Sequence, residues 1–530
     1  MVFNHLHRRI AGDLVNSEIP RRGVESAPEG RTTKSGPPRA YLAAMSNHAG
    51  TVLDLIEKDQ KNAVARLCDW LRIESISTDP RYRDQTRRAG QWCADQLKAL
   101  GFDVRLVETG AVGADGKGAG HPVVLATIKP ATTYRGPHVL FYGHYDVQPV
   151  DPLNLWESKP FEPTVRAARA GEEGGERIVA RGAVDDKGQV MTFIEACRAW
   201  KQATGHATGG AAYTVMIEGE EESGSANLEG FVKQFKDELS RCNVCLISDT
   251  GMVGRDKPAI TYGVRGLAYT QVTLHAANQD LHSGLWGGRC PNPITELCKV
   301  LAQLHDADRR ITIPGFYDAV RPISREERDA WAKLSRDTGV TAETTLKKIG
   351  LSPAADIGEK GYTFIEREWG RPTAEVNGIW GGYTGEGAKT VIPAHASAKV
   401  SFRLVADQEP AKIAQMFFAW LQERTPPGCR WECEDLHGGF GVTTPIDSPV
   451  LRKATAALER AAGTKPYMIK SGGSIPVAGM LKSILGLDTI FMGFGLDDDR
   501  VHSPNEKFEL ACYRLGTRAH AMFIDELIKP

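Results

Sequence analysis

Histidine and acidic residues follow several of the apolar runs in this sequence. The run VLFYGHYDVQP places His144 and Asp146 two residues apart, so both side chains lie on one side if the strand continues. Three further runs, ARGAVDDKG, MIEGEEESGS and LISDTG, end in acidic turns at Asp185 and Asp186, at Glu221 and Glu222, and at Asp249.

A metal ion would explain why so many acids occur at these positions. An acid at a strand end is often only the N-cap of the next helix, so each residue taken alone has an ordinary structural explanation. Acidic residues at the ends of several successive strands are not explained by capping alone, because carboxylates gathered in one cleft repel one another unless a cation holds them. His502, in DDDRVHSPNEKF, is a further candidate ligand. The pattern therefore predicts a metal site.

The elements that position these residues alternate between helices and strands. Hydrophobic residues recur at helical spacing from Thr51, and Gly101 ends the second helical stretch. Short apolar runs such as PVVLATI, HVLFYGHYDV, ERIVARGAV, YTVMIEGE and NVCLISD then predict strands, with helical patterns between them. This order predicts an α/β fold, with a mostly parallel sheet flanked by helices on both faces. In such a sheet the functional site lies just past the carboxyl ends of the strands.

The pattern changes near Gly266, where LAYTQVTLHA alternates as a half-buried strand does. Helical stretches and a second alternating strand, AKVSFRLVA, follow, and the α/β pattern returns after about Thr443. We therefore predict a catalytic domain formed by residues 46–265 and 442–530, with an inserted α+β domain at residues 266–441. A length of 530 residues also favours two domains over one.

Composition excludes several classes of protein. Lys and Arg number 65 against 66 Asp and Glu, a balance that argues against a nucleic-acid partner. No run of about 18 apolar residues occurs, so no membrane span is expected. Ten cysteines in a chain of this length do not suggest a disulfide framework, and we expect free thiols in a reducing, cytoplasmic compartment.

Residues 1–45 differ from the rest of the chain. They include a stretch rich in Arg, Gly, Ser and Pro without hydrophobic periodicity, which predicts disorder. A transit peptide and a translation start at Met45 are alternatives that the sequence leaves open, and it assigns no role to this extension.

Together the motifs resemble those of one metallopeptidase family. HYD, GAVDDKG, EGEEESGS, SDT and VHSPNE occur in that family's order and approximate spacing, and the resemblance extends from about residue 51 to the end. The family includes carnosinases, cytosolic non-specific dipeptidases, glutamate carboxypeptidases, aminoacylases and succinyl-diaminopimelate desuccinylases. TYGVRGLAY, DLHSG, GAKTVIP, SFRLV, LHGG and GGSIP are most similar to the dipeptidase branch. The resemblance implies a zinc exopeptidase-like fold whose inserted domain serves as lid and dimerisation domain.

The resemblance also implies a site with two divalent metal ions. The implied ligands are His144, Asp185, Glu222, Asp249 and His502. Asp185 would bridge both ions. His144 and Asp249 would bind one ion and Glu222 and His502 the other, or the pairs would be exchanged, because the sequence does not fix this pairing. Zinc suits this ligand set best, although manganese or cobalt would also fit donors that include no thiolate.

Two acidic residues are expected to support catalysis at this site. Glu221 matches the family's general base, which takes a proton from a metal-activated water and returns it to the leaving amine. Asp146 would orient His144 through its other ring nitrogen. In this family the peptide bond after the bridging aspartate is cis, which predicts a cis bond between Asp185 and Asp186.

Further residues match family positions for the oxyanion and the substrate. His282, in DLHSG, resembles a histidine that reaches the active site of the partner subunit, so we expect a homodimer with shared sites. Arg403 matches a carboxylate-binding arginine, although a charged residue at this position of a strand could simply face outward. His437, Gly473, Ser474 and Ile475 are further candidate substrate contacts. Domain closure would bring Arg403 over the metals and exclude water.

The predicted function is metal-dependent hydrolysis of the amide bond in dipeptides or short peptides with a free C-terminal carboxylate. An alternative keeps the mechanism but acts on N-acyl or N-carbamoyl amino acids, since both substrates place an amide next to a carboxylate. A remote alternative is a non-catalytic binding protein on the same fold. The sequence names neither the physiological substrate nor the native metal.

Overall fold

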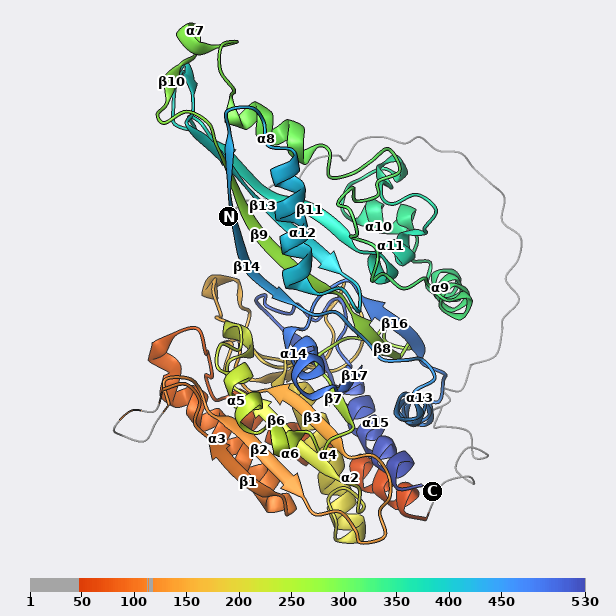
Figure 1. The fold of residues 1–530 in the computed structure, drawn as a ribbon. Coiled ribbons are helices and arrows are strands. Elements are labelled where there is room, and N and C mark those ends of the chain that lie inside the picture. Colours follow the sequence, from red (N-terminus) through yellow and green to blue (C-terminus); the bar gives the residue numbers. More distant parts are fainter. Residues whose placement is uncertain (1–46, 112, 114–117, 530) are drawn as a thin grey trace, which may run out of the picture. The chain divides into compact units, whose positions relative to one another are not determined.

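A nine-stranded sheet organises the segments that carry the candidate metal ligands (Figure 1). The computed structural model describes residues 47–111, 113 and 118–529, so the predicted extension at 1–45 and the alternative start at Met45 lie outside the described residues. Strand order is β1-β2-β6-β3-β7-β17-β8-β15, and β16 pairs with β8. The strands are β1 Asp103–Val107, β2 Val123–Ile128, β3 Val139–His144, β6 Tyr213–Glu218, β7 Val244–Ile247, β8 Ala259–Val264, β15 Val442–Thr443, β16 Tyr467–Ser471 and β17 Asp488–Phe491.

The centre of this sheet is parallel and covered on both faces. β6, β3, β7 and β17 run parallel to one another, whereas β1, β2, β8 and β15 pair antiparallel with their neighbours in the strand order. Every residue of β3 and β6 is buried, as expected for strands that lie between two helical layers. The structure confirms the predicted α/β fold.

Successive residues of β3 point into different cores. Phe141 belongs to the core beneath the long helices α2, α4 and α15, whereas Leu140 and Tyr142 belong to the core beneath α5 and α14. The helices around the sheet are α2 Asn47–Leu71, α3 Arg83–Leu100, α4 Lys187–Thr204, α5 Leu228–Gln234, α6 Lys236–Leu239, α13 Pro449–Ala462, α14 Pro476–Leu485 and α15 Leu510–Ile528, with the 3₁₀ helices η1 Pro80–Tyr82, η2 Leu153–Leu155 and η3 Glu221–Ser223.

The run ERIVARGAV forms a strand, but outside the central sheet. β5 Arg177–Val179 lies in a three-stranded sheet between β4 Thr164–Arg166 and β18 Lys507–Glu509. The sequence-based expectation of another central strand is therefore wrong here. Only three residues of the run pair, and its partner β18 lies more than 300 residues away along the chain.

A second sheet follows β8 along the chain. β11 Thr373–Gly381, β13 His395–Leu404, β9 Gly266–His275 and β14 Arg430–Gly439 form it in this order, all antiparallel. Burial alternates along β9, as the sequence predicted, because helices α8 Pro293–Leu301 and α12 Pro410–Glu423 pack against this sheet and help form its own core. The chain leaves the nine-stranded sheet after Val264 and returns to it at Val442.

The helical segment between α8 and β11 packs against the nine-stranded sheet. Trp331 and Leu334 of α9 and Ile365 of α11 belong to the same core as Phe141. The helices of this segment are α9 Arg325–Thr338, α10 Ala342–Lys348, η4 Pro353–Ala355 and α11 Phe364–Gly370.

A small two-stranded unit lies beyond the His275 end of β9 (Figure 1). β10 Leu281–His282 pairs with β12 Val391–Ile392, and α7 Ser283–Trp286 follows β10 directly. None of the helices in the described part of the chain combines the length and the apolar character that a membrane span requires.

Candidate metal centre and active site

The five predicted metal ligands come together at the carboxyl end of the central strands. Among the described residues, two groups of side chains could hold a metal ion: His144, Asp185 and Asp249, and Asp185, Glu222 and His502. Within each group the possible ligand atoms lie within 4.8 Å of one another. Asp185 belongs to both groups, so one carboxylate could serve two ions.

Different elements deliver these side chains to one place. His144 ends β3 and Asp249 follows the neighbouring β7, whose carboxyl ends meet because the two strands are parallel. Glu222 lies in η3, just after β6. Asp185 lies in the turn before α4, and the bond from Asp185 to Asp186 is cis, as the family resemblance predicted. His502 lies in the loop after β17 with a φ of 59°.

The environment of His144 fits a cation. Its Nδ1 lies 3.1 Å from the carbonyl oxygen of Asp146, while its Nε2 lies 3.2 Å from Asp185 Oδ1 and 3.7 Å from Asp249 Oδ2. Nε2 is buried without a well-aligned hydrogen-bond partner, and buried polar atoms of this kind normally have one. A divalent ion between the imidazole and the two carboxylates would satisfy it.

The second group has a similar arrangement around His502. Its Nε2 lies 2.9 Å from Asp185 Oδ2 and 3.2 Å from Glu222 Oε2. Gln148 donates from Nε2 to Glu222 Oε2 at 2.8 Å. Sequence reasoning missed Gln148, although it lies two residues after Asp146 in the same motif.

Without cations the site holds protons at neutral pH. Burial raises the pKa of Glu221 to about 8, and hydrogen bonds to Asp185 and Glu222 raise the pKa of His502 to about 10. Burial alone would lower the pKa of His144, but the nearby carboxylates raise it well above its usual value. Bound cations would favour the deprotonated form of each group.

Asp146 contacts both His144 and the backbone of η3. Its carboxylate accepts hydrogen bonds from the backbone N–H groups of Glu221 (3.3 Å) and Glu222 (3.0 Å), and its Oδ1 lies 3.4 Å from His144 Nδ1. One buried carboxylate thus fixes the turn that presents both glutamates. The shorter contact to His144 comes from the backbone carbonyl oxygen of Asp146, not from its carboxylate.

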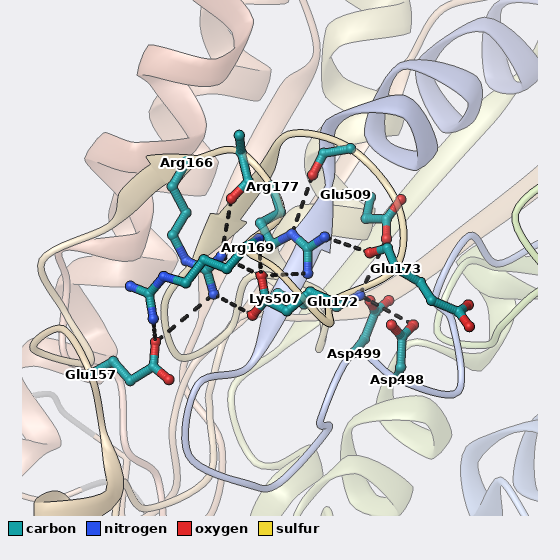
Figure 2. A network of polar contacts seen from close by, with 12 residues as sticks. Glu157, Arg166, Arg169, Glu172, Glu173, Arg177, Asp498, Asp499, Lys507 and Glu509 are labelled. Atoms are coloured by element: carbon teal, nitrogen blue, oxygen red, sulfur yellow. Dashed lines mark hydrogen bonds and ion pairs between the residues drawn. The ribbon is translucent and has the colours of Figure 1, made fainter. Parts of the chain in front are cut away.

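The loop that carries His502 is anchored by a polar network (Figure 2). Lys507 is buried and binds Asp499 at 2.5 Å and Asp498 at 3.2 Å. Arg255, which follows Asp249 along the chain, binds Asp498 at 2.6 Å. Its charge therefore links the loops that carry two of the candidate ligands. The sequence offered no signal for the Arg255–Asp498 pair, because its two residues lie 243 positions apart along the chain.

The predicted substrate-binding residues meet in part where the two sheets adjoin. Arg403, near the end of β13, donates from Nη1 to Ser474 Oγ at 2.9 Å. The Gly473 carbonyl accepts from the backbone N–H of Arg265 at 3.1 Å, and Ile475 is the N-cap residue of α14. His437, on β14, packs its ring edge-on against Tyr269 with centroids 5.2 Å apart. In the described part of the chain, none of these residues makes a hydrogen bond or ion pair with a candidate metal ligand.

His282 lies far from the metal ligands of its own chain. It ends β10, beyond the His275 end of β9, whereas the Gly266 end of β9 adjoins the nine-stranded sheet. A ten-residue strand is about 30 Å long. His282 is exposed, and its Nδ1 accepts a hydrogen bond from Gly284 N at 3.0 Å.

Comparison with known proteins gives matches along most of the chain. The family model described as Peptidase family M20/M25/M40 matches residues 140–526. Cys-Gly metallodipeptidase DUG1 of Candida albicans is 30% identical over 482 residues, which cover 88% of this chain and 95% of that protein. Beta-Ala-His dipeptidase of Homo sapiens is 30% identical over 514 residues, which cover 96% of this chain and 95% of that protein.

Solved structures match in fold as well. Human carnosine dipeptidase 1 has 30% sequence identity and a TM-score of 0.67, with 93% of this chain and 100% of that chain covered. The M20 family metallo-carboxypeptidase Sso-CP2 from Sulfolobus solfataricus has 30% identity and a TM-score of 0.69, with 88% and 99% covered.

Proposed function

Because this chain belongs to peptidase family M20/M25/M40, we propose that it hydrolyses the amide bond of dipeptides or short peptides with a free C-terminal carboxylate. Membership confirms the resemblance seen in the sequence and makes the chain a metallopeptidase that uses divalent metal ions. Two relatives that align along nearly their whole lengths are dipeptidases by name, one for Cys-Gly and one for Beta-Ala-His. The observation that carries the proposal is the pair of candidate ligand groups that share Asp185, with Glu221 beside them.

We propose two zinc ions as the resident metals. The donors are two imidazoles and three carboxylates, which suit zinc, and the absence of thiolate among them leaves manganese and cobalt as test cases. His144 and Asp249 would hold one ion, Glu222 and His502 the other, and Asp185 both. When bound, the ions supply the Lewis acidity that lowers the pKa of a water and polarises the amide carbonyl.

Glu221 would act as the general base. It lies beside the candidate ligand Glu222 in η3, and the Asp146 carboxylate holds the backbone of both residues. Its raised pKa in the metal-free site would fall when cations bind, which leaves a carboxylate able to accept a proton from water. The same carboxyl group then gives the proton to the leaving amine.

Arg403 would bind the C-terminal carboxylate of the substrate. A guanidinium presents two parallel donors to a carboxylate, and its contact with Ser474 fixes one side of the group. We place Gly473, Ile475 and His437 around the same end of the substrate.

His282 would stabilise the oxyanion in the active site of a partner subunit. The distance along β9 separates it from the ligands of its own chain, so only a second copy could present it there. The edge strand β11 carries the exposed side chains of Val376, Ile379 and Trp380, which supports a homodimer. In this proposal residues 266–441 form the lid and dimerisation domain, and residues 46–265 and 442–530 form the catalytic domain.

We also propose a cytoplasmic location. The ten cysteines are all free, and six of them are buried. Thiols in this state are typical of proteins in a reducing compartment.

The test is hydrolysis of a dipeptide panel by metal-stripped protein reconstituted with zinc, manganese or cobalt. Matched N-acetyl, N-succinyl and N-carbamoyl amino acids are assayed beside the dipeptides. We expect cleavage of dipeptides that depends on added metal, with zinc among the active ions. Preference for the acylated compounds would replace the proposal with an amino-acid deacylase. If the metal-loaded protein cleaves neither class of compound, the result would favour the alternative of a non-catalytic binding protein on this fold.

A further inference from the structure

Glu506 is a buried acid that the proposed chemistry does not use. It lies next to β18 and is fully buried. Its Oε2 accepts hydrogen bonds from Arg181 Nη1 (2.8 Å) and Gly182 N (2.9 Å). Its Oε1 accepts from Val184 N (2.9 Å) and Asp185 N (3.1 Å). One carboxylate therefore binds four donors in the turn that presents Asp185.

Only a carboxylate can satisfy this turn. Each of its oxygens faces two N–H groups, so both oxygens must accept hydrogen bonds and neither can donate. Arg181 balances the charge and is itself buried, with its second nitrogen bound to the Pro149 carbonyl at 2.9 Å. Hydrogen bonds to an ionised acceptor are the stronger kind.

The backbone of the turn beside the Glu506 carboxylate has a conformation that requires glycine at one position. Gly182 has a φ of +81°, and a Cβ there would come within 2.8 Å of Val147 Cγ1. The backbone N–H of Ala180 also donates to the Glu506 carbonyl at 3.1 Å. Both the main chain and the side chain of Glu506 thus hold the segment that leads to Asp185.

The other end of the connection is the loop of His502, four residues before Glu506. Asn505 accepts a hydrogen bond from Glu157 N and donates to the Leu155 carbonyl, both at 2.8 Å. Lys507 is held by Asp499. Glu506 is therefore fixed on a segment whose position determines where His502 lies.

We propose that Glu506 is a positioning residue that sets Asp185 and His502 at the spacing a metal ion needs. The proposal rests on the proposed function, which makes Asp185 and His502 metal ligands. Glu506 acts through the backbone of the turn and does not touch metal or substrate.

The test compares Glu506→Gln with a matched control, Glu359→Gln. In Glu506→Gln one oxygen becomes an NH₂ group that faces two N–H donors, so at least two hydrogen bonds to the turn are lost. Glu359 lies between η4 and α11, is also buried, and binds Arg371 at 2.6 Å and Arg310 at 3.2 Å. Its contacts within the described residues do not include the turn at 181–185. Both variants therefore remove one buried, paired negative charge, but only one loosens Asp185.

Zinc affinity of the metal-stripped proteins, measured by competition with a chromogenic chelator, is the readout. We expect Glu506→Gln to lower zinc affinity about 10- to 100-fold, as removal of the group that orients a ligand does, and Glu359→Gln to remain within about threefold of wild type. Equal affinity of Glu506→Gln and wild type would overturn the proposal, and so would an equal loss in both variants.

A second variant covers the case in which Glu506→Gln does not fold. Glu506→Asp keeps an acceptor-only carboxylate but shortens it by one methylene, so we expect a folded protein with an intermediate loss of zinc affinity. Wild-type affinity in Glu506→Asp would then refute the role. Because zinc binding is measured without substrate, a wild-type protein that binds zinc but cleaves no peptide would refute the proposed function and leave this inference standing.

Discussion

The position of His282 predicts that two differently damaged subunits can rebuild one working active site. Glu221→Ala removes the base from a subunit's own site, and His282→Ala removes the oxyanion donor that this subunit lends to its partner. β9 alone puts about 30 Å between His282 and the nine-stranded sheet, too far for one chain to supply both groups to one site. Each homodimer variant should therefore be defective in both of its sites.

The magnitude follows from counting complete sites. Loss of a general base lowers turnover by about 10²–10⁴, and loss of one oxyanion donor by about 10²–10³. In a heterodimer of Glu221→Ala with His282→Ala, one site has both groups intact and the other lacks both. We expect roughly half of the wild-type turnover per dimer, which is at least about 50-fold above either parent.

The assay uses heterodimers co-expressed with two different affinity tags and purified through both. The control heterodimer pairs a wild-type subunit with one that carries both substitutions, so it holds the same total changes. Shared sites predict that this control is inactive, because each of its sites lacks one group. The opposite pattern, an active control and an inactive mixed heterodimer, would refute the shared site and require His282 to act within its own chain.

Three further results are expected. Glu221→Gln should lower turnover about 10²–10⁴-fold while zinc content by mass spectrometry stays unchanged, and retained turnover would exclude this residue as base. Arg403→Lys should raise KM for dipeptides about tenfold or more, because an ammonium cannot make the paired contact; an unchanged KM would contradict the carboxylate role. Burial raises the pKa of Glu218 to about 7 from an ordinary 4.5. Between these pH values the folded protein keeps a proton that the unfolded chain has lost. The stability that is fully present below pH 4.5 is therefore lost as the pH rises through about 7. That loss of stability amounts to about 3 kcal/mol. Glu218→Gln keeps the oxygen that accepts hydrogen bonds from Tyr142 and Ser225, so it should abolish this loss when metal-stripped protein is unfolded in urea at pH 5 and pH 8. An equal pH dependence of stability in Glu218→Gln and wild type would contradict the assignment.

The convergence of the candidate ligands could be predicted from sequence because it depends on strand direction. Parallel neighbours bring their carboxyl ends to one edge, so an apolar run followed by His144 and another followed by Asp249 suffice to place both residues together. The fold class followed from the same alternation of helices and strands.

Long-range pairing explains what the sequence did not reveal. The run before Asp185 looks like any other buried strand, but its partner is β18, which lies far along the chain and pairs through only three residues. The Glu506 contacts with the turn at Asp185 likewise join segments more than 300 residues apart. Local patterns give the type of an element, whereas the partner of a short strand or of a single carboxylate depends on the assembled fold.

The helices α9 and α11 limit the rotation of the second sheet relative to the nine-stranded sheet. Their residues Trp331 and Ile365 are embedded in the core of the nine-stranded sheet, while Phe316 and Ala374, on either side of this segment, belong to the core of the second sheet. The backbone therefore passes between the two cores four times, not only after Val264 and before Val442. A rotation of one sheet against the other must be absorbed at all four passages, so its axis is confined and its amplitude is small compared with that of a module tethered by two strands.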